Sequence, residues 1–219
     1  MLGKISSVLF DMDGLLLDTE RIARDTFVGA CRAFGIEPDI AVYHRCIGTN
    51  HMRTQQILIE GYGRDFPLVG VEAVWLEKYH ALVWDNAVPL KPGARSLLEY
   101  CAAKGIRRAV VTSSRQESAE RKLANAGLRT FFEFVLGGDR IVNGKPHPEV
   151  YLTACRTLGE TPADCLALED SDHGVVAAHN AGLRVIQVPD LLPPSAEVLA
   201  LGHEVLPSLA AVEDLLRGL

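Results

Sequence analysis

The sequence predicts an α/β protein, with a doubly wound parallel-sheet core of the Rossmann-like type and an inserted α-helical cap domain. Two observations predict this class. Short aliphatic segments alternate with helical segments over most of the chain, as in parallel sheets whose strands are connected by helices. One long stretch, residues 17–87, carries helical signals only. The chain has 219 residues, of which 48% are hydrophobic and 23% charged, which is the balance of an ordinary globular protein.

The strands of the core are expected where short aliphatic runs contain β-branched or aromatic residues. These runs are Ile5–Phe10, Arg107–Val111, Phe134–Leu136, Cys165–Leu168 and Arg184–Val188. A helix between two strands returns the chain to the starting edge of the sheet, so successive strands are expected to run parallel.

The core helices are marked by proline or a capping residue at the start and by glycine at the end. We expect helices from Pro92 to Lys104, from Ser114 as N-cap to Gly127, from Pro148 to Gly159, and from Gly174 to Gly182.

The cap is expected to consist of three helices, Thr19–Phe34, Asn50–Glu60 and Val71–Asp85. Helices of this length need a common apolar core, so they should form a small bundle. The predicted domains are therefore an α/β core made of residues 1–16 and 88–219, and a helical cap made of residues 17–87.

Charge and cysteine content exclude several classes of function. The net charge of -6 and pI near 5.6 argue against a nucleic-acid partner, and an anionic substrate would need a local cation. The five scattered cysteines form no CxxC pair and indicate reduced thiols in a cytoplasmic protein. Residues 1–4 run directly into the first predicted strand, so no signal peptide is expected. No apolar run is long enough to span a bilayer, and no membrane partner is expected.

Reactive side chains follow four of the predicted strands. They are Asp11 and Asp13, Thr112 and Ser113, Lys145, and Glu169 and Asp170. Ligands of open parallel sheets bind beyond the carboxyl ends of the strands, so these side chains are expected to converge on one crevice.

The convergence of these residues predicts phosphoryl chemistry. Four acids close together need a counter-charge, because like charges raise one another's pKa, and Mg²⁺ is the usual cation beside phosphate. Lys145, the Thr112 hydroxyl and the Ser113 amide would bind phosphoryl oxygens. Asp11 would attack phosphorus, and Asp13 would act as the general acid and base.

These segments resemble the four motifs of the haloacid dehalogenase (HAD) superfamily, and are most similar to its β-phosphoglucomutase-like phosphatases. The segments are DMDGLLLDTE (Asp11–Glu20), Thr112-Ser113, Gly144-Lys145-Pro146-His147-Pro148, and Glu169-Asp170-Ser171 followed by Gly174. The resemblance implies Mg²⁺ bound by the Asp11 carboxylate, the Asp13 backbone carbonyl and Asp170, with Glu169 nearby. It also implies a cap that closes over the substrate, with specificity set by Thr19, Glu20, Asn50 and His51.

The expected function is that of a Mg²⁺-dependent phosphatase acting on a small phosphomonoester, a sugar phosphate or related metabolite, through an aspartyl phosphate. The expected assembly is a monomer or weak dimer. One alternative is a β-phosphoglucomutase-type mutase, although Ala23 and His51 stand where the resemblance places a histidine and an arginine in mutases. Another is a phospho-acceptor signalling domain, which would lack both the second acid, Asp13, and the cap.

Overall fold

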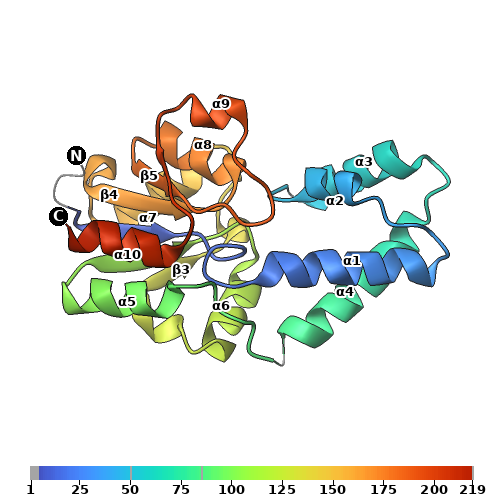
Figure 1. Ribbon diagram of the computed structural model, residues 1–219, viewed down its shortest axis with the longest axis horizontal. Helices are drawn as coiled ribbons and strands as arrows, with labels where there is room; N and C mark the ends of the chain where they lie inside the picture. Colours follow the sequence, from blue (N-terminus) through green and yellow to red (C-terminus); the bar gives the residue numbers. More distant parts are fainter. Residues whose placement is uncertain (1–4, 50, 85, 219) are drawn as a thin grey trace.

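The computed structural model describes residues 5–49, 51–84 and 86–218, and its core is a six-stranded sheet with the order β3-β2-β1-β4-β5-β6 (Figure 1). All neighbouring strands are parallel, and helices cover both faces of the sheet, which confirms the predicted fold class. The strands are β1 (Ser7–Phe10), β2 (Arg107–Val111), β3 (Phe134–Leu136), β4 (Cys165–Glu169), β5 (Arg184–Gln187) and β6 (Glu204–Val205).

The register brings the ends of the central strands level with one another. Phe10 of β1 lies opposite Val110 of β2 and Leu168 of β4. The chain therefore leaves β1, β2 and β4 at the same edge of the sheet, and the polar residues that follow these strands start from neighbouring positions.

Alternate residues of each strand pack on opposite faces, as the period of two requires. Val8 and Phe10 belong to the apolar core beneath three helices, and Leu9 belongs to the core on the other face. The first face is covered by α5 (Ala94–Ala103), α6 (Gln116–Asn125) and α10 (Leu209–Arg217). The second face is covered by α7 (Glu149–Leu158), α8 (Asp172–Asn180) and α9 (Ala196–Leu199). Short 3-10 helices lie elsewhere in the core, at Arg129–Phe131, Gly138–Arg140 and Pro162–Asp164.

Several helix starts differ from the prediction by one to three residues, and those of α6 and α8 bear on the site. Ser114 is not an N-cap, because α6 has Arg115 at that position and the Ser114 hydroxyl donates a hydrogen bond elsewhere. Helix α8 starts at Asp172 rather than at Gly174, and the Ser171 hydroxyl accepts a hydrogen bond from the Gly174 N–H. In both cases a polar residue after a strand could serve either a cap or a site, and sequence alone does not distinguish the two.

The cap is a bundle of α1 (Thr19–Ala33), α2 (Ile40–Cys46), α3 (His51–Tyr62) and α4 (Leu68–Val83), of which α2 was not predicted. Its centre is aromatic: the Phe27 ring lies 5.3 Å from that of Tyr43 and 5.1 Å from that of Trp75. Asn50 and Asp85, predicted as helix ends, lie outside the described residues. The cap therefore has an apolar core separate from the two beside the sheet.

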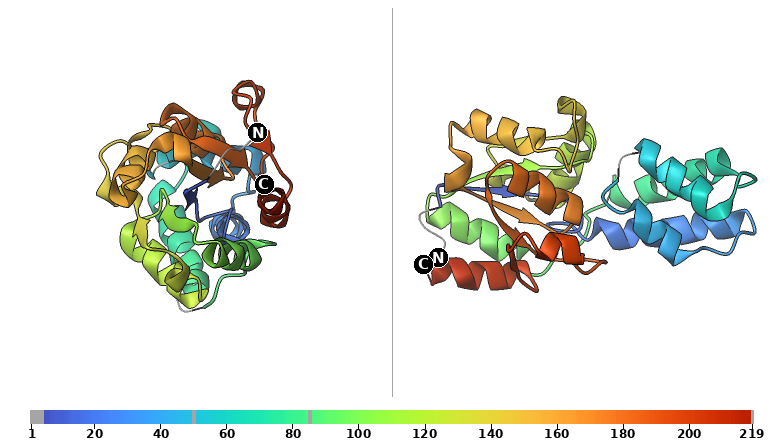
Figure 2. Two further views of the ribbon diagram at one scale, coloured as in Figure 1. Left: turned by 90° about the vertical axis from the view of Figure 1, so that its left-hand side faces the viewer. Right: turned by 90° about the horizontal axis from the view of Figure 1, so that it is seen from above.

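The two chain segments that connect cap and core lie side by side. Leu17 and Leu90 form an antiparallel bridge, the Asp18 N–H donates to Pro89 O at 2.9 Å, and the Lys91 N–H donates to Leu16 O at 3.0 Å. The cap projects from one end of the core (Figure 2). The first cap helix, α1, begins at Thr19, only a few residues after Asp11 and Asp13.

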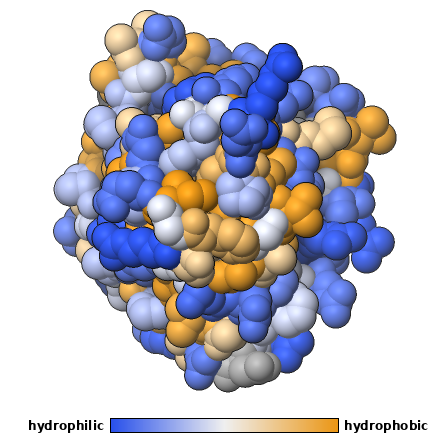
Figure 3. Space-filling view, turned by 90° about the vertical axis from the view of Figure 1, so that its right-hand side faces the viewer, coloured by the Kyte–Doolittle hydropathy of each residue, from blue (hydrophilic) through white to orange (hydrophobic). Residues whose placement is uncertain are grey.

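The outer end of the cap carries a small group of hydrophobic residues among hydrophilic ones (Figure 3). Exposed large hydrophobic side chains of the cap include Phe34, Ile40, Met52 and Val69. More than half of an ordinary protein surface is apolar, so scattered residues of this kind need no partner. None of the described helices is long and apolar enough to cross a membrane.

Candidate active site

The predicted core residues meet in one cavity of about 220 Å³ at the carboxyl edge of the sheet. The cavity lies between core and cap, because α4 and the chain around Thr49 also line it. The lining residues are Asp11, Asp13, Thr112, Ser113, Ser114, Lys145, Asp170, Ser171 and His173 from the core, and Glu20, Ile47, Gly48, Thr49 and Tyr79 from the cap. Of the predicted core site, Glu169 is the member that is fully buried and does not line the cavity.

Lys145 connects two of the acids. Its ammonium donates to Asp11 Oδ1 and Glu169 Oε1, both at 2.6 Å, and to the Val111 carbonyl at 3.0 Å. Burial would lower the pKa of Lys145, but the charges of Asp11 and Glu169 raise it above its ordinary value. Lys145 is therefore an ammonium held beside the first aspartate.

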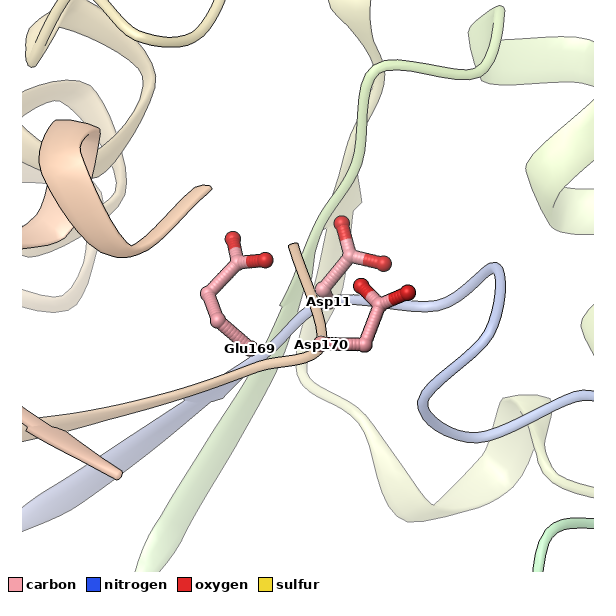
Figure 4. Close-up of side chains that lie close together, drawn as sticks. All are labelled: Asp11, Glu169 and Asp170. Atoms are coloured by element: carbon pink, nitrogen blue, oxygen red, sulfur yellow. The ribbon is translucent and has the colours of Figure 1, made fainter. Parts of the chain in front are cut away.

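Three carboxylates form a buried cluster beside this lysine (Figure 4). One oxygen from each of Asp11, Glu169 and Asp170 lies within 4.8 Å of those of the other two. Burial raises the pKa of Asp11 to about 7, despite Lys145, and burial together with Asp11 and Glu169 raises the pKa of Asp170 well above its ordinary value. One ammonium is therefore too little positive charge for three acids.

The cluster has the donor set that a hard divalent cation requires. All three ligand groups are carboxylates, and hard cations such as Mg²⁺ prefer oxygen ligands. Glu169 Oε1 accepts hydrogen bonds from Lys145 and Tyr151, whereas its buried Oε2 has no hydrogen-bond partner among the described residues. An unpartnered buried carboxylate oxygen and an excess of acid both fit a site that could hold a metal ion.

Two glycines give these carboxylates their space. A Cβ on Gly174 would lie 1.9 Å from Glu169 Oε2, and a Cβ on Gly14 would lie 2.3 Å from Asp170 Oδ2. Gly14 also has a φ of +83°, in the left-handed region that side chains disfavour. Both positions therefore require glycine for the acids to occupy their observed places.

Asp13 has a different environment. Its Oδ1 accepts hydrogen bonds from the Thr19 hydroxyl at 2.8 Å and the Lys122 ammonium at 2.6 Å, and its Oδ2 accepts one from the Ser114 hydroxyl at 2.7 Å. Burial would raise the pKa of Asp13, but Lys122 and the hydrogen bonds outweigh burial and lower it. Asp13 is therefore held as a carboxylate in this conformation.

The prediction did not assign Ser114 and Lys122 to the site. Ser114 directly follows the predicted phosphate-binding pair but was interpreted as a helix cap. Lys122 lies beside Ala119 and Leu123, which belong to the apolar core. The sequence signal that could have identified Lys122 is its position on the apolar face of a predicted helix, where a lysine is unusual.

The remaining predicted residues occupy different places. Thr112 is buried and its hydroxyl accepts the Ser114 N–H at 3.1 Å. Thr19 is buried against Asp13 and does not line the cavity, so in this conformation its side chain contacts the acid. Glu20 lines the cavity, and burial, together with Asp13 and Asp190, raises its pKa to about 7. Asn50 lies outside the described residues.

His51 is exposed and lines a second cavity of about 370 Å³ in the cap. This cavity shares Thr49, Tyr79 and Ser114 with the first one, and Trp75 forms part of its wall. A ligand that occupies the first cavity can therefore extend between the cap helices.

Comparison with known proteins identifies the family. Residues 8–188 match the model for haloacid dehalogenase-like hydrolases. The chain belongs to this family. Together with the helical cap and the similarities reported next, this match confirms the predicted membership, including the β-phosphoglucomutase-like subgroup.

Similar proteins of this family include two phosphatases and one solved structure. The phosphorylated carbohydrates phosphatase of Thermotoga maritima is 32% identical over 183 residues, 83% of this chain and 84% of that protein. The fructose-1-phosphate phosphatase YqaB of Escherichia coli is 30% identical over 190 residues, 86% of this chain and 98% of that protein. The crystal structure of CbbY from Rhodobacter sphaeroides in complex with phosphate has a TM-score of 0.76 at 29% identity, covering 95% of this chain and 96% of that one.

Proposed function

We propose that this hydrolase is a Mg²⁺-dependent phosphatase that acts on a small phosphomonoester, a sugar phosphate or related metabolite, through an aspartyl phosphate. One observation carries the proposal: Lys145 Nζ lies 2.6 Å from Asp11 Oδ1, in a cavity that Asp13 and Asp170 also line. The relatives support the substrate class, since their names give phosphorylated carbohydrates and fructose 1-phosphate as substrates.

Asp11 and Asp13 divide the reaction between them. An oxygen of Asp11 attacks phosphorus, and the ester P–O bond breaks as Asp13 gives a proton to the departing oxygen. Because the surroundings of Asp13 favour its carboxylate form, Asp13 must take up this proton before the ester bond breaks. Water then attacks the aspartyl phosphate while Asp13 takes up a proton, which releases phosphate and restores Asp11. The shared cavity supports this division, because both carboxylates line it.

Phosphate binding is assigned to Lys145, the Thr112 hydroxyl and the Ser113 amide. Lys145 is the ammonium beside Asp11, and charge-assisted hydrogen bonds to phosphoryl oxygens are strong. A bound phosphoryl group would share this ammonium with Asp11, so binding and nucleophilic attack would take place at one point of the cavity.

Mg²⁺ would be held by the carboxylates of Asp11 and Asp170 and the backbone carbonyl of Asp13, with Glu169 nearby. The oxygen donor set and the unpartnered Glu169 Oε2 support this fit. When bound, the ion supplies positive charge that keeps the acids ionised and offsets charge on the phosphoryl oxygens.

The test is a panel of phosphorylated metabolites assayed for inorganic phosphate release with Mg²⁺. We expect phosphate release from sugar phosphates and a reversible loss of activity in excess chelator. When the reaction with substrate is quenched rapidly with acid, we expect one phosphoryl group to be recovered on Asp11. Full activity in chelator would refute the metal role, and labelling of another residue would refute the nucleophile.

The same assays separate the alternatives. Conversion of glucose phosphates into isomers without phosphate release would indicate a mutase. A phosphoprotein that persists after treatment with a small phosphodonor would indicate a signalling domain, whereas rapid turnover is expected of a phosphatase.

A further inference from the structure

Lys122 is a buried cation that the proposed reaction does not use. Its side chain is 2% exposed, and it is not among the residues that line the cavity beside Asp11. Its neighbours on α6, Ala119 and Leu123, belong to the apolar core. An uncharged side chain would suit these surroundings better, since burial of a charge is unfavourable unless its partners are well placed.

The partners of Lys122 determine the direction of each hydrogen bond around Asp13. An ammonium can only donate, so Ser114 Oγ accepts from Lys122 at 3.2 Å. The single hydroxyl proton of Ser114 is then free to point to Asp13 Oδ2, 2.7 Å away. Lys122 also contacts Asp13 Oδ1 directly at 2.6 Å. It therefore acts on both oxygens of Asp13, on one of them through Ser114.

We propose that Lys122 is a positioning residue for Asp13: directly and through Ser114, it fixes the carboxyl group that exchanges protons with the leaving oxygen and the attacking water. This inference rests on the proposed function, and it adds a residue that acts without touching the substrate. The competing explanation is that Lys122 only neutralises a buried acid and stabilises the fold.

The two explanations differ in how the loss of Lys122 depends on the leaving group. A sugar phosphate releases a basic alkoxide oxygen that needs a proton, whereas p-nitrophenyl phosphate releases a weakly basic phenoxide that does not. The ratio kcat/KM reports the steps up to departure of the leaving group, so hydrolysis of the aspartyl phosphate does not mask the difference.

The experiment measures kcat/KM of Lys122→Met with a sugar phosphate that the wild type hydrolyses and with p-nitrophenyl phosphate. We expect a loss of about 10- to 100-fold with the sugar phosphate, the size that misplacement of a catalytic group causes. With p-nitrophenyl phosphate the loss should stay below about threefold. Lys104→Met, which changes an exposed lysine at the end of α5, is the matched control and should leave both values unchanged.

A second measurement asks whether Lys122 acts through Asp13. In an Asp13→Asn background, Lys122→Met should change kcat/KM with the sugar phosphate by less than about twofold, because groups that act as one unit are not additive. Equal losses with both substrates, no loss at all, or an additive loss in this background would overturn the proposal.

Ser114→Ala keeps the test decisive if Lys122→Met does not fold. This variant removes one of the two routes from Lys122 to Asp13, so a smaller loss with the same dependence on the leaving group is expected, and equal losses would overturn the proposal. A wild-type protein that releases phosphate from no phosphomonoester would refute the proposed function, whereas wild-type activity with equal losses in the variants would refute the role of Lys122 alone.

Discussion

The two halves of the site each contain a buried lysine that lowers the pKa of its aspartate, but the halves differ in how many acids surround that lysine. Asp11 lies in a cluster of three acids with Glu169 and Asp170, and the one ammonium beside them donates to Asp11 and Glu169. Burial raises the pKa of Asp11 to about 7. Around Asp13, Lys122 is paired with one carboxylate, which also accepts hydrogen bonds from the hydroxyls of Thr19 and Ser114. The pKa of Asp13 is lowered as a result. The Asp11 half therefore has more acids than cations and lacks positive charge, whereas in the Asp13 half the charges of the acid and the lysine are balanced.

The largest effect is expected from Asp11→Asn. An amide cannot form the aspartyl phosphate, so kcat/KM should fall by at least about 10³-fold with alkyl and aryl phosphates alike. The fold should remain intact, because the change removes one of several like charges. Initial rates together with circular dichroism check this, and turnover that survives in a preparation free of contaminating phosphatase would contradict the role of Asp11.

A smaller and selective effect is expected from Asp13→Asn. Loss of the general acid should lower kcat/KM for a sugar phosphate by about 10²- to 10⁴-fold. The loss with p-nitrophenyl phosphate should be clearly smaller, because its leaving group needs no proton. If both substrates lost activity equally, the two halves would not differ in the way that their surroundings indicate.

Gly174→Ala tests the Asp11 half through the metal. Its new Cβ would lie 1.9 Å from Glu169 Oε2, so the carboxylate must move. The Mg²⁺ concentration that gives half-maximal activity should rise about tenfold, as for other residues that support metal ligands. Gly29→Ala is the matched helical control, because its Cβ would meet only Lys78, at 3.8 Å. An unchanged Mg²⁺ requirement in Gly174→Ala would remove Glu169 from the metal site.

The smallest effect concerns the cap side of the cavity. Burial raises the pKa of Glu20 to about 7 in the folded protein, from an ordinary value of 4.5. Within this window the folded state binds a proton that the unfolded chain does not, so the free energy of unfolding falls as the pH rises. Glu20→Gln should therefore be more stable than the wild type by about 1–2 kcal/mol near pH 8, with the difference shrinking towards about pH 4.5.

Urea unfolding in chelator at several pH values measures this difference. A difference that does not depend on pH would show that the Glu20 carboxyl group titrates normally in the folded state. The excess of acid would then be confined to the core side of the cavity.

The sequence was informative where chemistry follows strands directly. Asp11, Thr112 and Asp170 lie one residue beyond β1, β2 and β4, and the common edge of a parallel sheet brings such residues together. The strands β2 and β3 were predicted to the residue. The strand β6 and the helices α2, α9 and α10 were not predicted, and β6, α2 and α9 are too short to carry much periodic signal.

Lys122 was missed for a different reason. Its helical spacing from Ala119 places it towards the apolar face, but a charged residue predicts solvent, so the two signals conflict. Its contact with Asp13 spans 109 positions in the sequence, and such pairs depend on how α6 packs against the sheet. Ser114 was misinterpreted because a hydroxyl after a strand suits a cap equally well.

The two chain segments that connect core and cap are bridged at Leu17 and Leu90, and this has a consequence for how such proteins diversify. Because the inserted segment departs and returns at one point, its two ends are fixed relative to each other whatever lies between them. Another insert with the same end-to-end spacing could be exchanged at this position without altering the strand order. Recognition of new molecules can in this way evolve apart from the machinery that breaks the bond.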